Sequence, residues 1–154
     1  MVRLTDLHPD DRANLIGKQL PRFDPPAYVP APPLAGSRIA LVTTAGLHLR
    51  SDRVFDMAST EYRNIGGETA TCDLVMSHTS VNFDRSGFTE DMNLVFLIDR
   101  FRELQASGAI GSMAHVHYSF MGAYLEPMDY GPSARELATL LRGDGVDSVF
   151  LTPV

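Results

Sequence analysis

The chain has 154 residues, of which 44% are hydrophobic and 21% are charged, and its formal net charge is -6. This composition is typical of one globular domain with a hydrophobic core. It lacks both the roughly 20-residue apolar run of a membrane helix and the clustered Lys and Arg that nucleic acid binding needs.

Residues 1–11 have no apolar stretch of the kind found in a secretory signal. The single cysteine excludes an internal disulfide and a multi-thiolate metal site. We therefore expect a cytoplasmic protein that contacts neither membrane nor nucleic acid.

Proline dominates the segment 21–36, which holds six of the ten prolines. Because proline fixes φ and lacks an amide hydrogen, this segment is predicted to run as an extended linker. Residues 10–20 before it have the pattern of a short helix. We divide the chain into an N-terminal arm, residues 1–36, and a domain, residues 37–154, and expect the arm to pack on the domain or on a partner subunit.

Strands and helices alternate through the domain. The run 38–44 is apolar and β-branched, as is typical of a strand buried on both faces. The predicted strands are residues 38–44, 62–65, 73–77, 112–120 and 146–152.

Two helices are predicted between the later strands. Residues 91–105 carry an apolar stripe at three- and four-residue spacing, and Gly108 is expected to end that helix. Ser133 and Glu136 have the spacing of a capping box at the start of a second helix, which ends at Gly143. The order indicates an α/β fold, an open and mostly parallel sheet flanked by helices as in a Rossmann-like three-layer sandwich.

Ligands of open parallel sheets bind beyond the carboxyl ends of the strands. The sequence therefore nominates polar side chains that end or follow its predicted strands. These are Thr44, His48 and Arg50 after the first strand, His78 after residues 73–77, and His117 and Ser119 within residues 112–120. Three of the five histidines are thus predicted to converge on one edge.

Each candidate also has a structural interpretation, because a lone histidine at a strand end is more often a hydrogen-bonded structural residue than a catalyst. A metal site made of His48, His78, His117 and Asp84 is conceivable, but no local spacing such as HxxxH supports it, so we assign no metal ligand. Cys72 precedes its strand and is expected at the opposite, amino edge as a passive thiol.

Several blocks resemble one enzyme family in order and spacing. Residues 39–50, IALVTTAGLHLR, are similar to a signature close to ALVTSGGVHL. Residues 73–78, DLVMSH, and 91–100, DMNLVFLIDR, resemble a second block, and residues 143–153, GDGVDSVFLTP, resemble a DGVDAVLLTP block. The family is the selenoprotein B family of glycine, sarcosine, betaine and D-proline reductases. The likeness covers about residues 36–154 and is nearest to the compact, D-proline-reductase-like members.

The resemblance implies a reductive cleavage of a carbon–nitrogen bond in a small amino acid or amine, with a disulfide as acceptor. In the family a selenolate or thiolate attacks the substrate and a second thiol resolves the adduct. If this mechanism applies, His78 and His117 are acid/base catalysts or partners of the thiolate. Thr44, His48 and Arg50 then line the substrate site, and Ser119 is a further hydrogen-bond donor.

The family's nucleophile comes directly after the strand that ends this sequence at Val154. The chain itself contains no cofactor group, and selenocysteine or cysteine is expected immediately after Val154 in a complete protein. A selenocysteine codon read as a stop, a deliberate truncation and a natural short homologue all fit this end. The chain also has Leu97 where the family usually has proline, which concerns helix geometry more than chemistry.

The expected partners are the substrate, a thiol/disulfide electron donor protein and further copies of the chain in a homo-oligomer. Two other interpretations stay open. One is a non-catalytic small-molecule binding or assembly module on the same scaffold, and the other is an enzyme that uses its histidines directly or through a metal. The sequence does not distinguish between glycine, betaine, D-proline and other amines as substrates.

Overall fold

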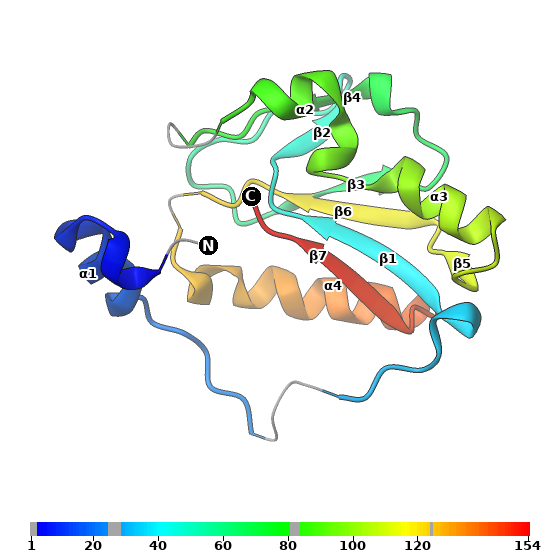
Figure 1. Ribbon diagram of the computed structural model, residues 1–154, viewed down its shortest axis with the longest axis horizontal. Coiled ribbons are helices and arrows are strands. Elements are labelled where there is room, and N and C mark those ends of the chain that lie inside the picture. Colours follow the sequence, from blue (N-terminus) through cyan, green and yellow to red (C-terminus); the bar gives the residue numbers. More distant parts are fainter. Residues whose placement is uncertain (1–2, 25–28, 81–83, 124) are drawn as a thin grey trace.

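The structure is a computed structural model, and it describes residues 3–24, 29–80, 84–123 and 125–154. A curled sheet with helices on its two faces forms the domain, and the arm lies to one side (Figure 1). The helices are α1 (Pro9–Gly17), α2 (Ser86–Glu90), α3 (Ile98–Ala106) and α4 (Gly131–Gly143). The strands are β1 (Arg38–Thr43), β2 (Leu47–Leu49), β3 (Tyr62–Gly66), β4 (Leu74–Met76), β5 (Ser112–Met113), β6 (Val116–Phe120) and β7 (Ser148–Thr152). Single turns of 3-10 helix are Leu4–Asp6, Leu34–Gly36, Thr71–Asp73, Met92–Leu94 and Pro127–Tyr130.

The strand β1 is the centre of the main sheet. Along one side it pairs in parallel with β7, from Ile39 opposite Ser148 to Thr43 opposite Thr152. Along the other side it pairs in parallel with β5 and then with β6, and β3 follows antiparallel to β6. The strands β1, β6 and β7 therefore end at one common edge, and the C-terminus lies there (Figure 1).

The α/β class is confirmed, but a mostly parallel Rossmann-like sandwich is not, because the sheet is mixed. The strand predicted at residues 73–77 is also absent from the main sheet, since β4 pairs antiparallel with β2 in a separate two-stranded sheet. Gly46 explains this difference. Its φ of 65° turns the chain out of β1, so that residues predicted as loop form β2 and give β4 its partner.

The two faces of β1 enter separate hydrophobic clusters. On one face Ile39 and Leu41 pack with Phe96 and with Ile98 and Phe101 of α3. On the other face Val42 packs with Tyr118, Phe120 and Leu137, the last from α4. Burial of a side chain such as Leu41 contributes roughly 1.5–3 kcal/mol, so these clusters hold the parallel strands in place.

Both predicted helices begin elsewhere than expected. The segment 91–105 is interrupted, because the Asp91 side chain accepts from Asn93 N and caps a 3-10 turn, and Leu97 then has a ψ of 32° before α3 starts. The helix α4 starts at Gly131, two residues before the predicted cap. The Glu136 side chain does not close a capping box and instead accepts a hydrogen bond from Tyr62 Oη at 3.0 Å.

The arm has the predicted short helix, α1, but none of its side chains is buried. Residues 18–24 and 29–33 form neither helix nor strand, as expected for a proline-rich segment, and residues 25–28 of this linker lie outside the described residues. In the ranges described above, no helix is both long enough and apolar enough to cross a membrane.

Candidate functional site

Backbone hydrogen bonds hold the ends of the parallel strands together. The Thr44 N–H donates to Thr152 O at 3.1 Å, and the Val154 N–H donates to Thr44 Oγ1 at 2.9 Å. Between β1 and β6, the Gly46 N–H donates to Phe120 O at 2.8 Å. These contacts fix Val154 beside the end of β1, at the edge where parallel sheets bind ligands.

Two glycines allow the chain segments to approach closely at this edge. Gly122 has a φ of 75° and Gly46 a φ of 65°, a region that favours glycine. A Cβ on Gly46 would lie 2.9 Å from His78 N, and a Cβ on Gly122 would collide with Thr44 O. The Ser77 N–H also donates to Gly46 O at 2.9 Å. His78 is therefore held against the end of β1, although β4 belongs to the other sheet.

A pocket of about 570 Å³ lies at this carboxyl edge. One wall comes from the domain and the other from the arm. The domain residues are His78, Ser80, Gly122, Ala123, Glu126 and Val154, and the arm residues are Asp11, Asn14, Leu15 and Lys18. The arm is joined to the domain here by an ion pair of 2.6 Å between Lys18 Nζ and Glu126 Oε1.

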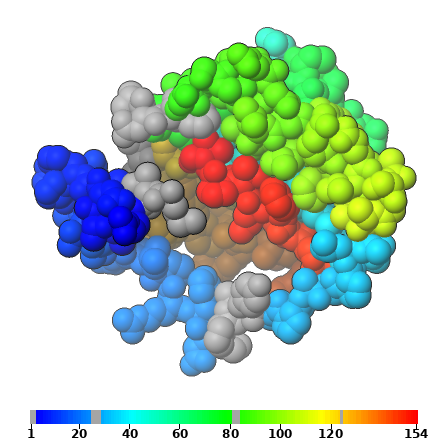
Figure 2. All heavy atoms as spheres, viewed as in Figure 1, coloured from blue at the N-terminus to red at the C-terminus, as the bar shows by residue number. Residues whose placement is uncertain are grey.

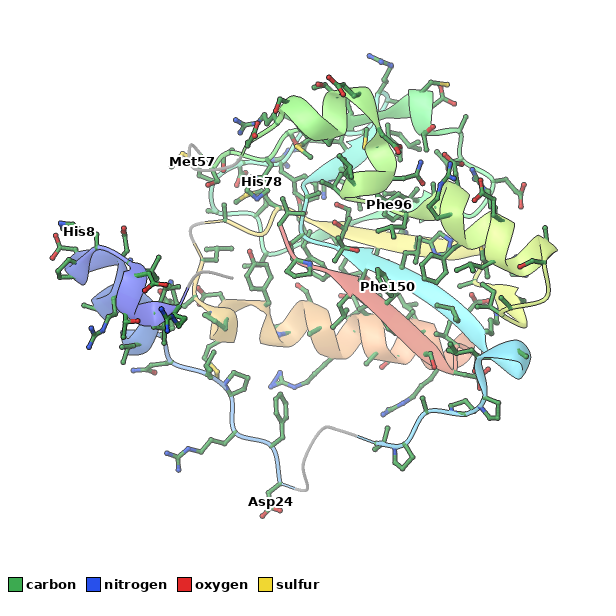
Figure 3. The ribbon with its side chains drawn as sticks, viewed as in Figure 1. His8, Asp24, Met57, His78, Phe96 and Phe150 are labelled. Atoms are coloured by element: carbon green, nitrogen blue, oxygen red, sulfur yellow. The ribbon has the colours of Figure 1, made fainter. Side chains whose placement is uncertain are left out.

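His78 is the buried titratable side chain of this pocket, with 6% of its surface exposed (Figure 3). Burial, and then the nearby Arg85 charge, lower the pKa of His78 below its usual value of 6.5. The Ser80 N–H donates to His78 Nδ1 at 3.3 Å, so the neutral ring carries its proton on Nε2. Arg85 also orders this loop, because its Nη2 donates to His78 O at 2.6 Å.

His117 lies deeper, in the hydrophobic cluster that α3 covers. The strand register places it level with Leu41 and Phe150, four residues or about 13 Å before Val154 at roughly 3.3 Å per residue. Its Nδ1 accepts from Leu41 N at 3.2 Å, and its ring meets Phe96 edge-on at 6.1 Å. Burial above all lowers the pKa of His117 to about 4, so this imidazole is neutral near pH 7.

The other candidates from the sequence separate into three places. Thr44 is at the carboxyl edge, where it binds Val154. Ser119 is fully buried beneath that edge, and its Oγ accepts from Leu47 N at 2.8 Å. His48 lies in β2 and the exposed Arg50 directly follows that strand. His48 Nδ1 donates to Leu49 O at 2.7 Å. Of the six candidates, His78 lines the pocket and Thr44 contacts its lining residue Val154, whereas the other four neither line the pocket nor bind Val154.

Sequence patterns did not reveal the arm's contribution to the pocket. Lys18 and Glu126 are 108 residues apart, and neither belongs to a motif or follows a predicted strand. The helical prediction for residues 10–20 was the available signal, but helix periodicity does not tell where an exposed helix docks.

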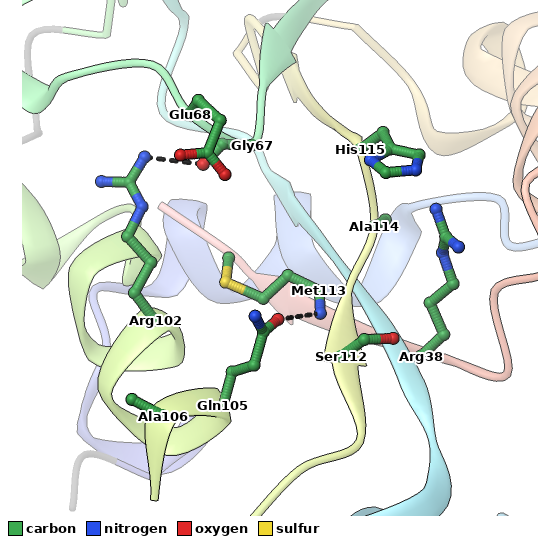
Figure 4. Close-up of a pocket in the computed structure, with 10 residues that line it drawn as sticks. All are labelled: Arg38, Gly67, Glu68, Arg102, Gln105, Ala106, Ser112, Met113, Ala114 and His115. Carbon is green, nitrogen blue, oxygen red and sulfur yellow. Dashed lines mark hydrogen bonds between the residues drawn. The ribbon is translucent and has the colours of Figure 1, made fainter. Parts of the chain in front are cut away.

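A second pocket, of about 400 Å³, lies at the amino edge of the parallel strands (Figure 4). Arg102 Nη2 donates there to Gly67 O at 2.6 Å and to Thr69 O at 2.8 Å. Arg38 Nη2 binds Asp144 Oδ1 at 2.8 Å. These arginines hold loops of the domain together and are already engaged in internal contacts.

The described residues contain no group of three or more His, Cys, Asp or Glu side chains placed to hold a metal ion. His48 lies in β2, His78 lies at the carboxyl edge and His117 lies in the hydrophobic core. Cys72, within the 3-10 turn before β4, is exposed and does not line the pocket at the carboxyl edge.

The chain is an α/β domain whose parallel strands end at a pocket with a buried histidine, at the edge of the sheet where open α/β sheets bind ligands. Residues 18–154 match the family described as glycine/sarcosine/betaine reductase selenoprotein B. The chain belongs to this family, as its sequence blocks predict.

Curated relatives carry the names of reductase subunits. D-proline reductase subunit gamma of Acetoanaerobium sticklandii is 32% identical over 136 residues, which are 86% of this chain and 55% of that protein. Sarcosine reductase complex component B subunit beta of Peptoclostridium acidaminophilum is 29% identical over 75% of this chain and 27% of that protein. Glycine reductase complex component B subunit gamma of Carboxydothermus hydrogenoformans is 27% identical over 82% of this chain and 32% of that protein. The chain spans about half the length of the first relative and about a third or less of the other two. No solved structure matches it.

Proposed function

We propose that the chain is a subunit of a selenol- or thiol-dependent reductase that cleaves a carbon–nitrogen bond of a small amino acid or amine. The observation that carries this proposal is the pocket at the common end of β1, β6 and β7, with His78 in its wall. The names of the relatives, all components of amino acid or betaine reductases, support the reaction class.

The reaction needs two electrons and two protons for each bond that is cleaved. A dithiol, or a selenol and a thiol, supplies both as it is oxidised to a disulfide or selenenylsulfide. The carbon–nitrogen bond becomes one C–H and one N–H bond, and the electron donor protein then reduces the oxidised pair. His78 is suited to take the proton of the attacking selenol or thiol and to pass it to the leaving nitrogen, because its lowered pKa keeps the imidazole neutral near pH 7.

The nucleophile of this proposal lies outside the 154 residues. Cys72 is the single thiol of the chain and does not line the pocket. We propose selenocysteine or cysteine immediately after Val154, and the hydrogen bond of Val154 with Thr44 at the carboxyl edge supports this proposal. The nucleotides after the Val154 codon test this: a TGA codon followed by an in-frame helix-coding stretch is expected, and any other continuation without a cysteine codon contradicts it.

Activity of the complete protein tests the reaction itself. With dithiothreitol as reductant, D-proline, glycine, sarcosine and betaine are incubated in turn, and cleavage products are measured by mass spectrometry. His78→Ala is expected to lower kcat by about 100-fold or more, as for loss of a general acid. Absence of cleavage of all four compounds by the complete protein, assayed with its electron donor, contradicts the proposal.

The roles of His117, Ser119, His48 and Arg50 in turnover stay predictions. His117 contacts the backbone of β1, so any effect on turnover would pass through the position of that strand. His117→Ala in the complete protein is predicted to abolish turnover while the fold is kept, and normal turnover would remove it from the catalytic set. Arg50→Ala is the corresponding test for a carboxylate-binding role.

Partner subunits are part of the proposal, because several relatives are named as components of complexes. In the described residues β7 pairs only with β1, and it lies at the surface in Figure 2. Leu151 is 67% exposed and Phe150 is 40% exposed. Large apolar side chains exposed together on an edge strand often mark a surface that a partner covers. We expect this edge to be covered in a homo-oligomer or by a partner subunit, and light scattering on the purified chain tests the homo-oligomer.

A second candidate function is a binding module without catalysis, favoured by the exposed position of the one thiol away from the pocket. Binding of an amino acid by the complete protein without any cleavage would support this alternative.

A further inference from the structure

The arm supplies half of the pocket at the carboxyl edge. The side chains of Asp11, Asn14, Leu15 and Lys18 face His78 and Glu126 across it. No side chain of α1 is buried, so the helix is not held there by a hydrophobic core. The ion pair of Lys18 with Glu126, at 2.6 Å, is the polar contact that joins the arm to the domain at this pocket.

The pocket carries charges of both signs. Lys18 contributes an ammonium group, and Glu126 and Asp11 contribute carboxylates. Within the described ranges, Asp11 forms no hydrogen bond or ion pair through its side chain, so it is available to a ligand. A ligand that carries one positive and one negative group can contact both the ammonium and the carboxylates, whereas an anion contacts the ammonium alone and a cation contacts the carboxylates alone.

The existing ion pair is weak enough to exchange partners. The Lys18 side chain is 30% exposed and the Glu126 side chain 52% exposed. Exposed pairs of this kind contribute little to stability, because water and salt screen the two charges. A zwitterion placed between them replaces this pair by charge-assisted hydrogen bonds to Lys18 on one side and to Glu126 or Asp11 on the other.

We propose that Lys18, Glu126 and Asp11 form a charge clamp that selects a zwitterionic amino acid, with its carboxylate on Lys18 and its ammonium on Glu126 and Asp11. This inference rests on the proposed function for the choice of site, but it assigns specificity to the arm rather than to the strand ends. Because the arm carries two of the three groups, Asp11 and Lys18, the ligand also holds the arm on the domain.

Binding to the full 154-residue chain tests the clamp by isothermal titration calorimetry or NMR, without turnover. D-proline, glycine and sarcosine are the zwitterionic probes. Pyrrolidine and cyclopentanecarboxylate are matched to D-proline but carry one charge each. At least one zwitterion is expected to bind, and D-proline is expected to bind several-fold more tightly than either single-charge analogue, because each analogue lacks one of the two charged contacts.

Substitutions then assign the effect to the residues. Lys18→Ala and Glu126→Gln are each expected to weaken binding of the zwitterion by about tenfold or more. The exchange Lys18→Glu with Glu126→Lys keeps both charges at the pocket and is expected to restore part of the binding. Arg12→Ala, on α1 but outside this pocket, and Glu68→Gln, at the amino edge, are controls that keep wild-type affinity. Thermal unfolding of every variant verifies that it is folded.

Absence of binding of all three zwitterions, equal affinity for the single-charge analogues, or wild-type affinity of both folded variants overturns the clamp. The outcome is separate from that of the reductase proposal. Zwitterion binding that depends on Lys18, without cleavage by the complete protein, keeps the clamp and removes the reductase. If the complete protein cleaves a substrate and Lys18→Ala leaves the KM unchanged, the reductase proposal is kept and the clamp is removed.

Discussion

The two pockets at opposite edges of the sheet use their charged side chains differently. At the amino edge Arg102 binds the carbonyls of Gly67 and Thr69 and the carboxylate of Asp99, and these contacts hold α3 to the loop after β3 (Figure 4). At the carboxyl edge Lys18 reaches the pocket from an exposed helix and makes one ion pair there. Charged groups engaged in several internal bonds stabilise the fold, whereas those with one exposed contact are free to recognise a ligand.

The backbone at the carboxyl edge is tightly packed around Gly46 and Gly122. The exposed charged side chains at this edge therefore lie beside a rigid backbone. The predictions below change one of these features at a time, from the largest expected effect to the smallest.

Gly122→Ala is expected to have the largest effect, because its Cβ would collide with Thr44 in a backbone conformation with a φ of 75°. The free energy of unfolding, measured in urea, should fall by at least about 3 kcal/mol. Gly108→Ala is the matched control, since Gly108 has a φ of 74° but no atom within 4 Å of the new Cβ, and it should cost about 1 kcal/mol. Equal losses would show that packing at the carboxyl edge is not tight.

The free energy of unfolding should depend on pH through His117, which lies between the two edges of the sheet. Its pKa is about 4 in the folded protein and 6.5 when unperturbed, so the unfolded state binds the proton more strongly. The contribution is fully present above pH 6.5 and is lost as pH falls towards 4, by roughly 3 kcal/mol in total. His117→Gln keeps an acceptor for Leu41 N. In this variant the free energy of unfolding, measured in urea from pH 7 to pH 4, should lack the decrease that His117 causes. An unchanged slope would show that His117 does not cause it.

Arg102→Ala should destabilise the fold by about 2 kcal/mol, because a partly buried set of charge-assisted hydrogen bonds to two carbonyls is lost. Arg102→Lys should recover only part, since an ammonium lacks the planar fork of donors. Arg100→Ala is the control on the same helix. Its exposed pair with Glu103 should contribute less than about 0.5 kcal/mol. Weaker binding of D-proline by Arg102→Ala would contradict the separation of the two pockets.

Lys18→Ala should have the smallest effect on folding, less than about 1 kcal/mol, because its ion pair is exposed. Chemical denaturation measures this value, and the ligand titrations described above measure its effect on binding. A loss of several kcal/mol would mean that the arm is an integral part of the fold and not an adaptable wall of the pocket.

The sequence by itself determined where the strands of the main sheet lie, the short helix of the arm and the family. Apolar runs such as residues 38–44 are long enough to specify buried strands, and glycines at 108 and 122 mark turns whose φ is positive in the structure. The rule that ligands bind at the carboxyl edge also led to Thr44 and His78, which lie at the pocket or next to it.

The tertiary structure decided the pairing of β4, the depth of His117 and the position of the arm. Strand periodicity is the same for parallel and antiparallel neighbours, so it did not predict that β2 would pair with β4. Position along a strand shows how far a histidine lies from the edge only when the register is known, and the register depends on the neighbouring strands. An exposed helix with no buried face carries no sequence signal for its docking site, and the contact of Lys18 with Glu126, 108 residues away, is therefore visible only in three dimensions.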